Sequence, residues 1–196
     1  MMSDPISVLD FWLQDIGPKG WYLGGEEIDG TIRDGFEELC VAAHDGGLEH
    51  WVESPAGALA YLLLTDQFPR NIWRGEARAF SCDPRALAAA RKAIAAGWDM
   101  QVPEPERQFF YLPFEHSEDP ENQVLSVEYI STRLPEGGEE SALHARAHAE
   151  TIRRFGRFPY RNEALGRENT HAETAFLAAG GYAHMVQELR NRETSA

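Results

Sequence analysis

Apolar residues recur along most of the chain at the three- to four-residue spacing of an amphipathic helix. Four of these segments begin where an N-cap residue precedes proline. Proline suits the first position of a helix because the N–H that it lacks would have no partner there. These dipeptides are Asp4-Pro5, Ser54-Pro55, Asp83-Pro84 and Asp119-Pro120. The pattern predicts helices over residues 5–15, 27–45, 55–66, 84–96, 104–112, 120–133, 141–155 and 170–179.

No segment alternates clearly with the two-residue period of a strand, so the predicted fold class is all-α. Most connections are short, and successive helices are therefore expected to run antiparallel in a bundle or an array of helix pairs. We expect a single domain over residues 1–196, with its core at about 5–180 and a C-terminal tail over 181–196. Residues 135–140 are expected to form a surface loop.

The composition narrows the class of protein. The chain has 196 residues, of which 43% are hydrophobic and 26% charged, as is typical of globular proteins. Its net charge of −14 disfavours binding to nucleic acid or to an anionic membrane. The N-terminus has no basic segment, and the longest apolar stretch, 56–64, is about half a membrane span. Cys40 and Cys82 lack the spacing of a zinc cluster. We therefore expect a cytoplasmic protein without a metal or cofactor.

Positive charge is concentrated in two segments. Residues 66–91 hold five arginines and three acidic residues, and residues 144–167 hold six arginines and two acidic residues. Arginine favours fixed, bidentate pairing with carboxylate or phosphate, so these segments are candidates for a positive pocket. The alternative is structural, because arginine also pairs with glutamate and complements helix C-termini.

Three similar strings follow predicted helices. Residues 66–75 (Asp-Gln-Phe-Pro-Arg-Asn-Ile-Trp-Arg-Gly) and 156–167 (Gly-Arg-Phe-Pro-Tyr-Arg-Asn-Glu-Ala-Leu-Gly-Arg) share Phe-Pro, Arg-Asn and a further arginine. The third string is residues 111–119 (Tyr-Leu-Pro-Phe-Glu-His-Ser-Glu-Asp). Each proline is expected to end the preceding helix. If neighbouring helices alternate in direction, all three strings lie at the same end of the bundle.

Two histidines lie four residues apart on the predicted helix 141–155. His148 shares a face with apolar residues, so we expect it to point inward, either as a hydrogen-bonded core residue or as a general acid/base. His144, His148, His116 and Glu118 also have the side chains of metal ligands, but beyond one i, i+4 pair they have no recognised metal spacing.

The three strings, together with Val8-Leu-Asp-Phe-Trp-Leu, Trp21-Tyr22 and Ala79-Phe-Ser-Cys-Asp-Pro, closely resemble an uncharacterised, mainly bacterial family, domain of unknown function 924. The resemblance covers residues 6 to about 180. It implies an all-helical fold in the tetratricopeptide-like superfamily, with irregular repeats and no established activity. The positions that match the family's polar motifs are Asp66, Gln67, Arg70, Asn71, Arg74, His116, Ser117, Glu118, His148, Arg157, Arg161, Asn162 and Arg167.

The chain departs from the family pattern at two places. Tyr160 stands where the family usually has histidine, so a mechanism that needs a histidine at that position does not carry over. After Trp21, the chain has Leu-Gly-Gly in place of the commoner Lys-Asp. His144 falls where the family is expected to have an aromatic residue, so no role is carried over to it.

The sequence is compatible with three interpretations of the matched residues. The first is a pocket that binds a small anionic molecule or an acidic peptide. Its ligand-binding residues would be Asp66, Gln67, Arg70, Asn71, Arg74, Ser117, Arg157, Arg161, Asn162 and Arg167.

The second interpretation is an enzyme acting on a carboxylate- or phosphate-bearing metabolite, with His116, His148 and Glu118 as catalytic residues. The third is purely structural: Arg70 and Arg161 bond the carbonyls of helix ends, and Asp66 and Glu118 pair with them.

Overall fold

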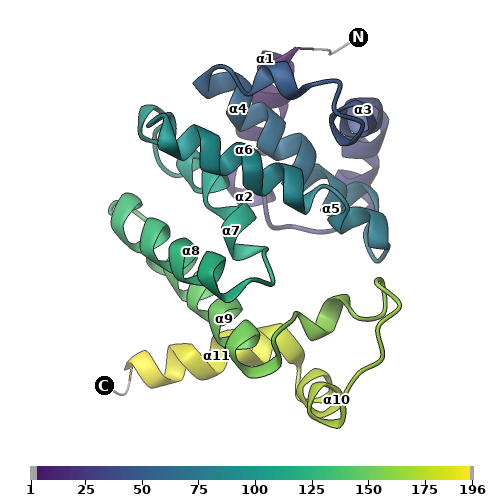
Figure 1. Ribbon diagram of the computed structural model, residues 1–196, viewed down its shortest axis with the longest axis vertical. Coiled ribbons are helices and arrows are strands. Elements are labelled where there is room, and N and C mark those ends of the chain that lie inside the picture. Colours follow the sequence, from purple (N-terminus) through teal and green to yellow (C-terminus); the bar gives the residue numbers. More distant parts are fainter. Residues whose placement is uncertain (1–3, 195–196) are drawn as a thin grey trace. The chain divides into compact units, whose positions relative to one another are not determined.

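The computed structural model describes residues 4–194, and all of their regular secondary structure is helical (Figure 1). The predicted all-α fold class is therefore confirmed. The internal contacts of the chain group into two compact units, an N-terminal unit (Met1–Pro113) and a C-terminal unit (Phe114–Ala196). The expectation of one domain over the whole chain stays a prediction.

The N-terminal unit is built mainly from α-helices connected by short irregular helical segments. Its α-helices are α1 (Pro5–Leu9), α2 (Gly17–Gly20), α3 (Glu26–His44), α4 (Pro55–Leu62), α5 (Phe68–Ile72) and α6 (Asp83–Ala95). Two π-helical segments, η1 (Asp10–Ile16) and η3 (Leu63–Gln67), continue α1 and α4. Its 3-10 segments are η2 (Glu49–Trp51), η4 (Ala77–Phe80), η5 (Asp99–Gln101) and η6 (Glu106–Phe110).

The C-terminal unit follows α7 (Leu112–Glu115), the short helix that contains the boundary. Its helices are α8 (Pro120–Arg133), α9 (Glu139–Phe155), η7 (Pro159–Arg161), α10 (His171–Ala178) and α11 (Gly181–Thr194). Helix α9 packs against α8 on one side and α11 on another (Figure 1). It is therefore the central helix of this unit.

Most of the predicted helix starts are observed as N-caps. The side chains of Asp4, Ser54 and Asp119 each accept a hydrogen bond from a main-chain N–H in the first turn of the following helix. Asp83 differs, because it is the first residue of α6, after the N-cap Cys82, and its carboxylate accepts hydrogen bonds from Arg70. Of residues 135–140, expected as a loop, 135–138 form a turn, and 139 and 140 are the first residues of α9.

The expectation that Pro69 ends its helix was wrong. Helix α4 continues through the π-helical segment η3 into α5, and Pro69 lies at the start of α5. In η3 the N–H of Phe68 bonds the carbonyl of Leu63, so the hydrogen-bond register lengthens by one residue just before the proline. Proline has no N–H to donate, and it is tolerated at a helix start because an N–H there needs no partner in the helix.

Two further expectations differ from the structure. Of the expected helix 104–112, only residues 106–110 are helical before α7 begins, and they form the 3-10 segment η6. Pro113 lies inside α7 instead of ending a helix. Proline disfavours the α conformation of the residue before it, so Pro105 opposes a helical conformation at Glu104, where the helix was expected to begin. Residues 181–194, expected as a tail, form α11 because Met185 and Val186 are buried. Residues 195 and 196 lie outside the described part of the chain.

Each unit has its own core. In the N-terminal unit, aromatic rings from segments distant in the chain pack together. The ring of Phe68 meets that of Trp12 edge to face, at 5.3 Å between centroids, and that of Phe36 at a tilt, at 5.2 Å. In the C-terminal unit, Leu143 and Ala147 of α9 pack with Met185 of α11.

Within residues 4–194, no helix is long and apolar enough to cross a membrane.

Candidate functional site

The C-terminal unit holds a buried pair formed by a histidine and a carboxylate. Nδ1 of His148, on α9, lies 3.0 Å from Oε1 of Glu115, at the end of α7. The side chain of His148 is 11% exposed and that of Glu115 is 6% exposed. As the sequence predicted, His148 points inward, because it shares the face of α9 that packs into the unit. Water therefore has little access to the pair, which strengthens the attraction between its charges.

The neighbours of His148 determine which ring nitrogen carries the proton. Besides Glu115, Nδ1 lies 3.0 Å from the main-chain carbonyl oxygen of His144. Both partners accept hydrogen bonds only, so Nδ1 is the protonated nitrogen. The Tyr182 hydroxyl, 3.0 Å from the same nitrogen, then donates to Nδ1 of His144, at 2.7 Å. Nε2 of His148 is the ring nitrogen that none of these contacts uses.

Burial acts to raise the pKa of Glu115, but the charge and hydrogen bond of His148 oppose it. The charges of His116 and His144 act in the same direction, and the pKa of Glu115 falls below its ordinary value. Glu115 is therefore ionised at neutral pH. An ionised, fixed carboxylate holds the imidazole in one tautomer and one orientation.

Aromatic rings surround His148. The ring of Phe158 meets it edge-on at 5.4 Å between centroids, and the rings of Tyr182 and His116 lie at 4.5 and 6.1 Å. The guanidinium carbon of Arg161 lies 4.5 Å from the centre of the same Phe158 ring, and its Nη2 donates to the carbonyl of His116. The structure thus brings together three of the predicted site residues, His116, His148 and Arg161.

The two arginines of the first string are held by carboxylates of the N-terminal unit. Arg70 donates to both carboxylate oxygens of Asp83, at 3.0 and 3.2 Å, and to the carbonyl of Asp66, at 2.7 Å. Arg74 donates to both carboxylate oxygens of Asp29, at 2.9 and 3.0 Å. Burial acts to raise the pKa of Asp29, but its hydrogen bonds, first with Arg74, lower it. The bidentate geometry is that of a strong internal ion pair.

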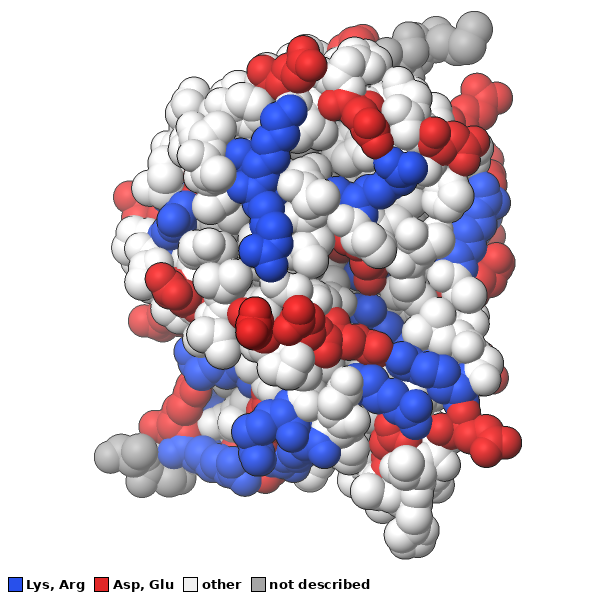
Figure 2. All heavy atoms as spheres, in the orientation of Figure 1, with Lys and Arg blue, Asp and Glu red and all other residues white. Residues whose placement is uncertain are grey.

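The arginines of the second string are held in the same way. Arg157 donates to both oxygens of Glu173, at 2.6 and 2.8 Å, and Arg167 donates to both oxygens of Glu118, at 2.8 and 3.0 Å. Glu118 also accepts from the N–H of Phe158. Glu118, predicted as a catalytic residue, is thus not bonded to His148. On the face shown in Figure 2, basic side chains likewise lie beside acidic ones.

The remaining predicted residues are held by hydrogen bonds within the protein. Gln67 donates to Asp66, Asn71 to Asp29, and Asn162 to Asn169. The Ser117 hydroxyl accepts hydrogen bonds from Asn122 and from the N–H of Asp119. The three strings do not all lie in one unit: the first is in the N-terminal unit and the second is in the C-terminal unit. Their expected common end stays a prediction.

Two residues of the cluster around His148 were missed in the sequence. Glu115 precedes His116 inside the third string, and a carboxylate within an apolar stretch was the available signal. Tyr182 follows Gly180-Gly181 in the segment expected to be a tail, so nothing in the sequence placed it beside α9. In the part of the chain from 4 to 194, the structure has no group of three or more His, Cys, Asp or Glu side chains placed to hold a metal ion.

The chain matches the model of a family described as bacterial protein of unknown function (DUF924), over residues 8–181. A solved structure of a protein of unknown function, ATU0120 from Agrobacterium tumefaciens, is 38% identical in sequence with a TM-score of 0.82. The alignment covers 88% of this chain and 96% of that one. Comparison with curated proteins gives no match. The chain therefore belongs to the DUF924 family of bacterial proteins of unknown function.

Proposed function

We propose that the protein is an enzyme that uses His148 as its general acid and base. The observation that supports this is the buried contact of 3.0 Å between Nδ1 of His148 and Oε1 of Glu115. A carboxylate on one nitrogen of an imidazole is the arrangement by which enzymes orient a histidine that transfers protons at the other nitrogen. Every hydrogen bond of the His148 ring within residues 4–194 involves Nδ1. Nε2 is therefore the atom that meets the substrate.

The proton transfer follows from this arrangement. Neutral His148 accepts a proton at Nε2 from a substrate or from an attacking water molecule and becomes an imidazolium. The negative charge of Glu115 stabilises this cation without taking up the proton itself. The imidazolium then returns the proton from Nε2 to the leaving group or to the rearranged substrate, which restores the neutral ring.

The substrate class that we propose is a small metabolite with a carboxylate or phosphate group. The guanidinium of Arg161 is permanently charged and packs on the Phe158 ring that also contacts His148. Arg70, Arg74, Arg157 and Arg167 each bond both oxygens of a carboxylate. An anion would have to displace that carboxylate, so these four fit the structural interpretation better.

The test is a search for turnover with the purified protein. Phosphate esters, carboxylate esters, amides and lactones of small acids are each incubated with the protein, and products are measured by liquid chromatography and mass spectrometry. For any substrate found, His148→Asn is expected to lower kcat/KM by at least about 100-fold. Glu115→Gln is expected to lower kcat and to change the pH profile, because the imidazolium loses its negative partner.

The matched control is His171→Asn, which changes an exposed histidine at the start of α10. It is expected to leave turnover unchanged. Circular dichroism and melting temperature establish that each variant is folded. Turnover that survives His148→Asn in a folded protein, or the absence of turnover with every substrate class, would overturn the proposal.

A further inference from the structure

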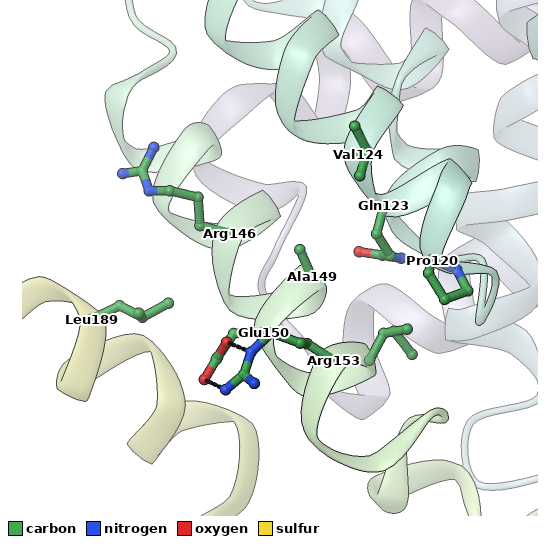
Figure 3. A pocket seen from close by; sticks show the side chains of 9 residues that line it. Pro120, Gln123, Val124, Arg146, Ala149, Glu150, Arg153 and Leu189 are labelled. Carbon is green, nitrogen blue, oxygen red and sulfur yellow. Dashed lines mark hydrogen bonds and ion pairs between the residues drawn. The ribbon is translucent and has the colours of Figure 1, made fainter.

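A groove runs along the C-terminal unit between α8, α9 and α11, on residues that the acid–base proposal does not use. Its volume is about 420 Å³, and its lining includes Val124, Ala149, Ile152 and Leu189 (Figure 3). This volume lies within the range of small-molecule sites. Ala149 is the smallest of these side chains, so the surface of α9 is hollowed at this point.

One buried polar side chain faces this groove. The amide nitrogen of Gln123, which is 2% exposed, donates to the main-chain carbonyls of Phe114, Glu115 and Ser117. These three acceptors fix the orientation of the amide, and its oxygen points toward Ala149 (Figure 3). Within residues 4–194, the Oε1 atom of Gln123 is buried and has no hydrogen-bond partner. A buried acceptor without a partner is costly, and a donor arriving from the groove removes that cost.

The charged side chains along the groove are paired with one another, and one guanidinium keeps donors for a further anionic group. Glu150 is bonded by Arg153, at 2.6 and 2.8 Å, and by Arg154, at 2.6 Å, so its charge is compensated. Arg146 donates from Nε to Glu193, at 2.8 Å. Within the described chain, no hydrogen bond involves the terminal guanidinium nitrogens of Arg146. These N–H groups remain available for a carboxylate at the margin of the groove.

We propose that this groove binds a compact aromatic acid that carries one N–H donor. The ring packs on Ala149 and Val124, the N–H donates to Oε1 of Gln123, and the carboxylate contacts the terminal nitrogens of Arg146. The apolar lining excludes water from the ring, and the single buried acceptor selects for a donor at one position. The site is separate from the pair of His148 and Glu115 and holds whether or not that pair is catalytic.

The test is isothermal titration calorimetry of the full chain with indole-3-acetate, which has an indole N–H, an aromatic body and a carboxylate. The comparison ligand is naphthalene-1-acetate, which has a similar ring and the same acid group but no N–H. Saturable binding of indole-3-acetate is expected, with an affinity at least about 5-fold higher than that of naphthalene-1-acetate. Equal affinities, or no saturable binding of the indole acid, would overturn the proposal.

Two variants locate the binding. Ala149→Phe fills the groove without removing a hydrogen bond and is expected to abolish binding. Arg146→Gln removes the charge and is expected to weaken binding several-fold. The control is Ala178→Phe, at an exposed position of α10, which is expected to bind as the unaltered chain does. Binding that persists in a folded Ala149→Phe variant would place the ligand elsewhere and refute the assignment.

Discussion

Glu118, in the third string, was predicted as a catalytic residue, but its contacts with the second string favour a structural role. Its two oxygens accept from Arg167, at 2.8 and 3.0 Å, and one of them also accepts from the N–H of Phe158, at 2.8 Å. The change Glu118→Gln keeps the size of the side chain but removes its charge. It also turns an amide NH2 group toward the donors of the guanidinium. We therefore expect Glu118→Gln to destabilise the C-terminal unit.

The magnitude follows from these three contacts. A hydrogen bond to a charged group contributes about 1.5–3 kcal/mol, but exposed ion pairs contribute less because solvent screens them. The side chains of Arg167 and Glu118 are 23% and 29% exposed, so this discount applies. We expect a net loss of about 2 kcal/mol, which lowers the melting temperature of a chain of this size by about 4–8 °C.

The pH dependence has a definite sign. Burial acts to raise the pKa of Glu118, but the hydrogen bond and charge of Arg167, with the N–H of Phe158, lower it below 4.5. The stabilisation is therefore complete above that ordinary value and is lost as the pH falls through the lowered pKa. The difference between the variant and the unaltered chain should shrink as the pH is lowered from about 7 to about 3.

Urea denaturation and thermal melting followed by circular dichroism measure these differences. The control is Glu163→Gln, an exposed glutamate in the second string, with an expected change within about 0.5 kcal/mol. A double-mutant cycle with Arg167→Gln isolates the interaction between the two side chains. The structural role of Glu118 is refuted if the variant melts as the unaltered chain does at pH 7, or if its deficit is the same at both pH values.

Three other predictions concern separate parts of the fold. Tyr182→Phe removes the hydroxyl that bonds His144, so urea denaturation should show a loss of about 1 kcal/mol, and no loss would argue against the hydrogen-bond network. Gly57→Ala would place a methyl carbon 2.2 Å from the carbonyl oxygen of Trp51, so a melting temperature lowered by several degrees or insoluble expression is expected, and unaltered stability would contradict this packing. Burial raises the pKa of the Cys40 thiol, so iodoacetamide should modify it in urea but not in the native protein, as measured by mass spectrometry.

The helices themselves could be predicted from local signals. Residues 120–133 were predicted and observed with the same bounds, because Asp119 caps the helix and Pro120 starts it. Two exceptions, at Pro69 and Pro113, involve prolines whose effect depends on context. Pro69 was expected to end a helix, but the π-helical segment before it has a wider hydrogen-bond spacing, and the helix continues through the proline. Whether a helix ends or continues at a proline depends on the packing around it, which no local pattern contains.

The sequence by itself determined the all-α class, most helix bounds, the inward direction of His148 and the family. Only the tertiary structure decided what the charged side chains contact. The partners of Arg74 and Arg167 are Asp29 and Glu118, which lie 45 and 49 positions away in the chain. Tyr182 likewise contacts His148, from which it is separated by 34 positions in the chain. Helix formation depends on near neighbours in the chain, whereas ion pairs depend on how helices pack, and that packing is a property of the whole unit.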